Sequence, residues 1–190
     1  MTDAGHGSSS LDALRDHLLA HSVRRGVFKL KSGHLSNWFI DAKQTLCRPD
    51  GLLLMAEAVL DALPDDTVAI GGLTMGADPV AFGTAGVAAT RGRAIKAFSV
   101  RKEAKDHGRG GRIAGALDPG DQVVVVEDVA TRGTSLLEAA LAVRDAGAKP
   151  TLLLAVVDRG GTCAAMAAAE GLSFHALLTA PDLGLDYEGG

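Results

Sequence analysis

Two neighbouring carboxylates follow a run of four valines in the stretch VVVVEDVATRGTS, residues 123–135. The valines predict a buried strand, and Glu127 and Asp128 stand at its carboxyl end, where an open parallel sheet binds ligands. The loop behind them contains Gly133, which lets the backbone approach an anion closely at the start of a helix. Backbone N–H groups there can form an anion cradle together with three hydroxyl groups, those of Thr131, Thr134 and Ser135.

An acid pair beside a phosphate cradle suits one kind of ligand. Carboxylates do not bind phosphate themselves, but they accept hydrogen bonds from ribose hydroxyls or contact a Mg²⁺ ion that a phosphate also touches. A sugar 5-phosphate satisfies both halves of the motif, so the sequence predicts a ribose phosphate ligand. The alternative is that the strand merely ends in acids and that a Thr or Ser caps the next helix.

The segment KEAKDHGRGGR, residues 102–112, is highly charged and then rich in glycine. Basic residues outnumber acids between residues 101 and 112, although the chain as a whole has a formal net charge of −4. No apolar period runs through the segment, so we expect a long mobile loop between two strands. Beside a phosphate site, such a loop suits a lid that closes over a polyanion. The alternative is a solvated surface loop.

Several other functions lack their motifs. The sequence contains no G-x-x-x-x-G-K-[ST], no G-x-G-x-x-G between a strand and a helix, and no H-E-x-x-H. Its two cysteines, Cys47 and Cys163, are far apart, which predicts buried free thiols in a reducing, cytoplasmic setting. The net charge gives no hint of nucleic-acid or membrane affinity, and no apolar run is long enough to span a bilayer.

Alternating apolar strands and helices predict an α/β fold with a parallel sheet covered on both faces. Helical spacing predicts helices over residues 11–25, 49–63, 77–90, 135–146 and 163–170. Apolar runs predict strands over residues 67–72, 94–101, 123–128, 151–158 and 172–178, whereas residues 28–43 look irregular or β-like. We expect residues 1–10 to form a disordered lead-in and residues 11–190 to form a single domain.

The motifs resemble those of a known family. Residues 123–135 resemble the PRPP-binding motif of type I phosphoribosyltransferases. The stretch VRKEAKDHG, residues 100–108, is similar nearly letter for letter to the catalytic loop of orotate phosphoribosyltransferases. FKLKSGHLSNWFIDAK at residues 28–43, GGLTMGADPVA at 71–81 and VVDR at 156–159 resemble further segments of that family in the same order.

The resemblance implies the type I phosphoribosyltransferase fold, with a small N-terminal hood segment at about residues 11–45. It also implies transfer of the phosphoribosyl group of PRPP to orotate, with Mg²⁺ as cofactor, in a homodimer whose catalytic loop is shared across subunits. The residues matched to PRPP are Arg101, Lys102, Lys105, His107, Glu127, Asp128, Val129, Ala130, Thr131, Arg132, Gly133, Thr134 and Ser135. Those matched to orotate are Lys31, Phe39, Thr131 and Arg159, and those matched to catalysis are Lys105, Asp128 and His107.

Physical chemistry adds roles to some of these matches. Phe39 can cover the face of planar orotate, and Arg159 can meet its carboxylate with two donors. Core packing for Phe39 and a surface position for Arg159 are the alternatives. His107 can act as a proton donor, as a phosphate contact or only as a loop residue. No dedicated metal ligand is identified, because PRPP itself is expected to hold most of the Mg²⁺ shell.

Two residues depart from the family's pattern. Some members carry a Tyr-Lys pair in the pyrophosphate-side loop, where this chain has Met75 and Gly76. Arg132 stands in the phosphate loop, where a small residue is more usual. The remaining alternatives are a phosphoribosyltransferase for another base and a PRPP-sensing regulator without catalysis. The charged-loop match argues against another base, and Lys105 together with the lack of a basic DNA-binding element argues against a regulator.

Overall fold

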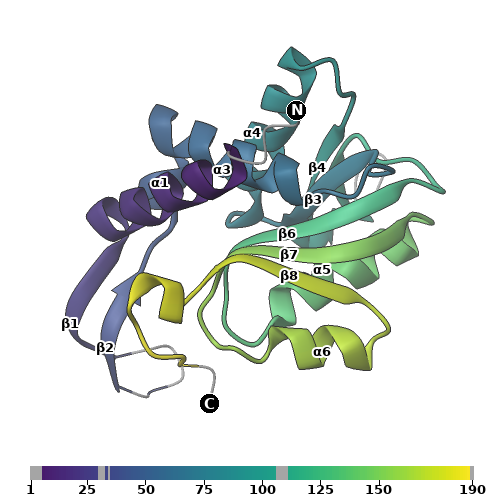
Figure 1. The fold of residues 1–190 in the computed structure, drawn as a ribbon. Coiled ribbons are helices and arrows are strands. Elements are labelled where there is room, and N and C mark those ends of the chain that lie inside the picture. The colour runs from purple at the N-terminus through teal and green to yellow at the C-terminus, as the bar shows by residue number, and fades with distance from the viewer. Residues whose placement is uncertain (1–5, 30–32, 34, 106–110, 189–190) are drawn as a thin grey trace.

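The computed structural model of the 190-residue chain describes residues 6–29, 33, 35–105 and 111–188. Its centre is a six-stranded sheet with the strand order β5-β4-β3-β6-β7-β8 (Figure 1). All neighbouring strands run parallel except β4 and β5. The strands are β3 (Ala69–Leu73), β4 (Lys96–Lys105), β5 (Gly111–Gly115), β6 (Gln122–Ala130), β7 (Lys149–Asp158) and β8 (Ser173–Thr179).

Helices cover both faces of this sheet, as the apolar strands predict. The helices are α1 (His6–His21), α2 (Lys43–Leu46), α3 (Pro49–Ala62), α4 (Ala77–Thr90), α5 (Thr134–Asp145) and α6 (Cys163–Ala169). The valines of β6 alternate between the faces: Val124 and Val126 join the core under α1 to α4, and Val123 and Val125 join the core under α5 and α6. Both layers therefore hold β6 rigidly at the centre.

The N-terminal part differs from the prediction in two ways. Helix α1 begins at His6, so residues 6–10, which we expected in a disordered lead-in, are helical; residues 1–5 lie outside the described residues. The helix ends at His21 instead of continuing to Arg25. Residues beyond it form β1 (Val23–Lys29), which pairs antiparallel with β2 (Leu35–Ile40). Gly26 lies where the register shifts in this hairpin, with a φ of 150°.

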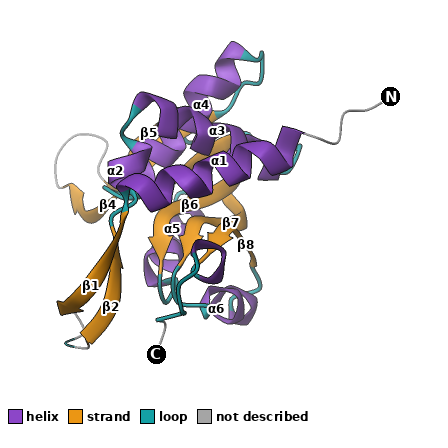
Figure 2. Cartoon of the chain, turned by 60° about the vertical axis from the view of Figure 1, so that its left-hand side comes forward, coloured by secondary structure: helices purple, strands orange, loops and turns teal. Residues whose placement is uncertain are grey.

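This hairpin projects away from the main sheet (Figure 2). It lies within the predicted hood segment, and we use the name hood for β1 and β2. Its buried residues alternate along β2, where Ser36, Trp38 and Ile40 face inward. The segment was predicted as irregular or β-like because serine, glycine and asparagine interrupt its apolar pattern. The structure shows that period-two burial survives those interruptions.

The charged segment is more ordered than the predicted loop. Strand β4 continues to Lys105, and β5 begins at Gly111, so β-structure takes up both ends of the segment. Ser99 pairs with Ala114 and Val100 with Ile113 across the two antiparallel strands. The residues between them, 106–110, lie outside the described part of the chain.

Two smaller features complete the comparison with the sequence. Cys163 is buried, as predicted, but Cys47 is exposed, because it follows the last turn of α2 at the surface. A one-turn 3₁₀ helix at Pro181–Leu183 leads into the C-terminal segment. Among the described residues, no helix has the length and apolarity needed to cross a membrane.

Candidate active site

The acid pair lies near the carboxyl end of the central strand β6. Both residues carry carboxyl groups, yet Glu127 is only 9% exposed and Asp128 only 5% exposed. Glu127 pairs with Ala155 of β7, and two residues of β6 follow Asp128 before the strand ends. Burying two adjacent carboxyl groups is costly without a partner, so this pair indicates a site and not ordinary packing.

Lys43 supplies a cation to this pair. Its Nζ lies 3.0 Å from Oδ2 of Asp128 and 3.2 Å from Oδ1 of Asp41. The other oxygen of Asp128 accepts a hydrogen bond from the backbone N–H of Val129 at 2.8 Å. Sequence reasoning did not identify Lys43, although it is the last residue of the hood segment FKLKSGHLSNWFIDAK.

Glu127 has a different environment from Asp128. Burial, and then the neighbouring Asp128 carboxyl, raises the pKa of Glu127 to about 9. Its Oε2 atom is buried and has no hydrogen-bond partner among the described residues. A carboxyl group that keeps its proton presents both a donor and an acceptor, which suits ribose hydroxyls.

The phosphate loop follows β6 directly. Residues 131–133 bend, and α5 begins at Thr134 rather than at the predicted Ser135. Gly133 is the N-cap residue in the left-handed region, with a φ of 76°, and a Cβ atom there would overlap Met166 of α6. The N-terminus of α5 is thus built as an open cradle of N–H groups, and Arg132 lies exposed at its rim.

The loop after β3 lies against the acid pair. Asp78 fixes this loop by accepting hydrogen bonds from Thr74 and Ser99, both at 2.7 Å. A Cβ atom on Gly76 would overlap the carboxylate oxygens of both Glu127 and Asp128. Gly76 therefore packs directly against the two acids, with no space for a side chain between them, and Met75 beside it is exposed.

The basic residues of the charged segment divide into three groups. Arg101 and Lys102 lie in β4, half-buried and exposed respectively. Arg112 does not belong to a lid, because it pairs with Glu138 of α5 and donates to the backbone of Arg101. The backbone of Lys105 ends β4, whereas its side chain and all of His107 lie outside what the structure describes, as does Lys31.

Arg159 is buried beside the phosphate loop. Its backbone N–H donates to Ala130 at 2.8 Å, which ties the end of β7 to the end of β6. Its guanidinium lies over the Trp38 ring, 4.7 Å from the centroid, and forms an ion pair with Glu188. The surface alternative for Arg159 is thus wrong. The hood also places Phe39, which is 40% exposed and packs against Phe28 with 5.7 Å between ring centroids.

These elements converge at the carboxyl end of the sheet. The carboxyl ends of β3, β6 and β7 meet there, together with α2 and the hood. The acid pair, the α5 cradle and a buried guanidinium next to an aromatic ring match a phosphorylated ribose and a planar anion. On a mostly parallel sheet of this order, they define a type I phosphoribosyltransferase.

Comparisons with known proteins narrow this class. No protein-family model matches the chain. The chain is 39% identical to the orotate phosphoribosyltransferase of Synechocystis over 169 residues, which cover 88% of this chain and 85% of that protein. It is 45% identical to the one from Aquifex aeolicus over 134 residues, which cover 70% and 73%. The chain therefore belongs to the orotate phosphoribosyltransferase family.

Solved structures agree with this membership. Orotate phosphoribosyltransferase of Mycobacterium tuberculosis, in a complex with PRPP, matches with a TM-score of 0.79 and 34% identity over 93% of this chain and 99% of that one. A phosphoribosyltransferase from Corynebacterium diphtheriae matches with a TM-score of 0.81 and 39% identity, with the same coverage. The family, the fold and the enzyme class predicted from the sequence resemblance are confirmed.

Proposed function

We propose a division of labour among the residues of this chain for the reaction of its family. In that reaction, the phosphoribosyl group of PRPP passes to orotate and gives orotidine 5′-monophosphate and pyrophosphate. Glu127 and Asp128 hold the ribose hydroxyls, and residues 130–135 hold the 5-phosphate. Phe39, Thr131, Arg159 and Lys31 contact orotate. Arg101, Lys102, Lys105 and His107 face the pyrophosphate, and Lys105 and His107 act with Asp128 in catalysis.

The observation that carries this proposal is the junction of β6 and α5. Glu127, whose pKa is raised to about 9 by burial and whose Oε2 has no partner among the described residues, and Asp128, which is paired with Lys43, precede an open helix N-terminus within a few residues. Hydroxyls and a phosphate group of one ligand fit the two halves at the same time. A base alone or a phosphate alone would leave one half unused.

The chemistry requires charge control at two places. A ring nitrogen of orotate loses its proton and forms a bond to C1 of the ribose while the bond from C1 to the pyrophosphate oxygen breaks, so pyrophosphate and a proton are released. Positive charge develops on the ribose ring and negative charge on the leaving pyrophosphate. The carboxylate of Asp128 lies on the ribose side, and the basic residues of the 101–107 segment lie on the pyrophosphate side, so each developing charge meets its opposite.

Mg²⁺ belongs to this proposal as the ion that PRPP would bring with it, and it would neutralise charge on the pyrophosphate. The acid pair is not expected to bind this ion with all of its oxygens, because Lys43 already occupies Oδ2 of Asp128. We also propose a homodimer, in which the 101–107 segment of one subunit completes the site of the other. Closure of that segment excludes water from C1. A cytoplasmic location agrees with the two free thiols.

The direct test is the near-ultraviolet absorbance of orotate in the presence of purified protein, PRPP and Mg²⁺. A steady fall in absorbance that requires all of these components supports the proposal. If absorbance does not change while PRPP still binds in calorimetry, the protein acts on another base or senses PRPP without catalysis. If PRPP does not bind, the assignment of the phosphate loop is wrong.

A further inference from the structure

Lys43 is not among the site residues that the sequence suggested, yet its ammonium group contacts Asp128 of the acid pair. It lies 85 residues from Asp128 in the chain, so this contact depends on the packing of α2 against α1, α3 and α4. The lysine side chain is 41% exposed, whereas the Asp128 side chain is 8% exposed. Lys43 thus pairs with a buried carboxylate. Removing one partner of a buried ion pair costs more free energy than removing one partner of a surface pair.

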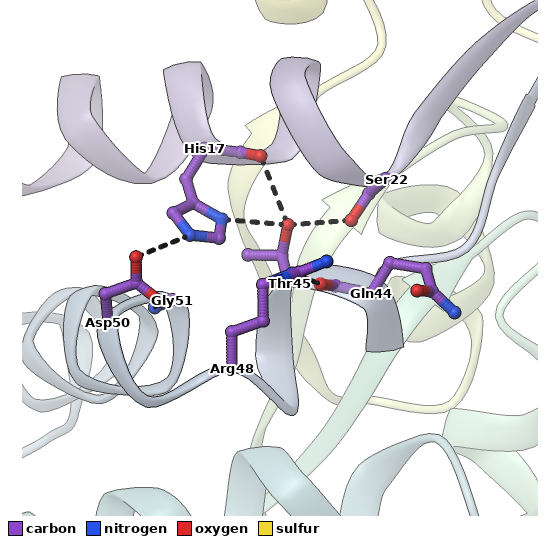
Figure 3. A network of polar contacts seen from close by, with 7 residues as sticks. All are labelled: His17, Ser22, Gln44, Thr45, Arg48, Asp50 and Gly51. Atoms are coloured by element: carbon purple, nitrogen blue, oxygen red, sulfur yellow. Dashed lines mark hydrogen bonds and ion pairs between the residues drawn. The ribbon is translucent and has the colours of Figure 1, made fainter.

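Helix α2 presents Lys43 from a fixed position. Figure 3 shows Thr45, two residues further on, at the centre of a polar network between α1, α2 and α3. Its hydroxyl accepts from Ser22 at 2.7 Å, lies 3.2 Å from Nδ1 of His17, and is 3.3 Å from the His17 carbonyl. The opposite ring nitrogen of His17 lies 3.2 Å from Asp50. This network anchors a helix of four residues that is too short to be stable alone.

The first turn of α3 fixes α2 from the other side. Gly51 lies so close to Thr45 that a Cβ atom would overlap its backbone carbonyl. Thr45 and Leu46 are both fully buried. The backbone of Lys43 therefore has little freedom, and its side chain spans the remaining distance to the acid pair.

Asp128 in turn is held at both oxygens. Lys43 binds Oδ2, and the backbone N–H of Val129 binds Oδ1. Gly76 lies so close to Oδ1 that a Cβ atom there would overlap it. These contacts together fix the orientation of the carboxylate.

We propose that Lys43 is a positioning residue for phosphoribosyl transfer, which holds the Asp128 carboxylate in the orientation that receives the ribose. This inference rests on the proposed role of Asp128. Lys43 acts through Asp128 and does not need to touch the substrate. The network around Thr45 contributes to this positioning, because it ties α2, the helix that carries Lys43, to α1.

The test compares K43M and K43R with K96M. Lys96 is a matched control, because its ammonium also lies between two aspartates, 2.8 Å from Asp118 and close to Asp121, but at the amino end of β4, away from the site. We expect K43M to lower kcat/KM and to weaken PRPP binding in calorimetry by about ten- to a hundredfold. K43R should recover most of this loss, and K96M should change neither quantity more than twofold.

A double-mutant cycle separates positioning from mere stabilisation. If Lys43 acts through Asp128, K43M should have almost no further effect on kcat/KM when it is added to D128N. Losses that multiply instead, or a K43M protein that keeps parental kcat/KM, would overturn the inference. If K43M does not fold by circular dichroism, K43Q replaces it. PRPP calorimetry also distinguishes the positioning role of Lys43 from the proposed function. If the parent protein does not convert orotate but K43M still weakens its PRPP binding, the role of Lys43 is supported and orotate transfer is contradicted.

Discussion

The carboxylate of Glu188 lies against the guanidinium of Arg159, which we propose as the partner of the orotate carboxylate. The pair is largely buried, with side-chain exposures of 20% and 9%. Ser36 also donates to Glu188 at 2.6 Å, and the backbone N–H of Glu188 donates to the carbonyl of Arg159 at 3.0 Å. The C-terminal segment is therefore fastened at the place where the anionic base is expected.

A substrate carboxylate must compete with Glu188 for this guanidinium. We predict that E188Q lowers the KM for orotate by about tenfold, which corresponds to ~1.4 kcal/mol of competition removed. Steady-state kinetics at saturating PRPP measures this change, and D186N, an exposed carboxylate in the same segment, is the control. A higher KM for E188Q would mean that Glu188 orients Arg159 and does not compete.

The parts of the fold that the sequence revealed are those with strong local signals. Four consecutive valines followed by acids and a Gly-Thr-Ser loop predicted β6 and the start of α5 nearly to the residue. Strand β5 and the end of β4 were missed, because backbone pairing at the edge of the sheet holds them and their side chains carry no apolar period.

The missed site residues have a different cause. Lys43 and Glu188 reach Asp128 and Arg159 through long-range packing, over 85 and 29 residues. No spacing rule connects such pairs in one sequence. The extent of α1 was misjudged because Arg24 and Arg25 continue its polar pattern, although the exposed face of a hairpin accepts the same residues.

The raised pKa of Glu127 predicts a pH dependence of stability. Because the folded state holds this proton up to a pH of about 9 and the unfolded state releases it near 4.5, the free energy of unfolding should fall as pH rises between these values. E127Q removes this dependence. Between pH 6 and pH 9 we expect the free energy of unfolding of the parent to fall by about 1 kcal/mol or more relative to that of E127Q. Urea unfolding without ligand measures the difference.

E170Q is the control for this experiment, because Glu170 is an exposed glutamate at the end of α6. It should leave the pH dependence of the parent unchanged. Equal slopes of unfolding free energy against pH for E127Q and the parent would show that Glu127 is ionised in the folded protein, and the acid pair would then carry two charges.

Gly160 leaves no room for a side chain beside the phosphate loop. A Cβ atom there would overlap the backbone carbonyl of Thr131, the first residue of that loop. We expect G160A to lower the free energy of unfolding by about 1–3 kcal/mol and to weaken PRPP binding, because the loop must shift. Denaturant unfolding and calorimetry measure both effects.

Gly86 provides the contrasting substitution. It is exposed within α4, and apart from its chain neighbours and its own helix backbone no atom of the described residues lies within 4 Å of the position that a Cβ atom would take, so G86A should raise stability by about 0.4–1 kcal/mol. PRPP binding should not change. A G160A protein with parental PRPP affinity would show that the loop tolerates displacement of Thr131.

Lys105 tests the charge proposed for the pyrophosphate side. Removing one preorganised charge typically raises a reaction barrier by ~2.7–4 kcal/mol, so K105A should lower kcat by about two to three orders of magnitude. Its backbone pairs with Gly111 at the edge of the sheet, and the substitution keeps that pairing, so thermal unfolding should change little. K149A, an exposed lysine at the opposite end of the sheet, should keep the parental kcat. A loss under tenfold for K105A would remove Lys105 from the catalytic residues and leave the pyrophosphate to the other basic residues of the segment.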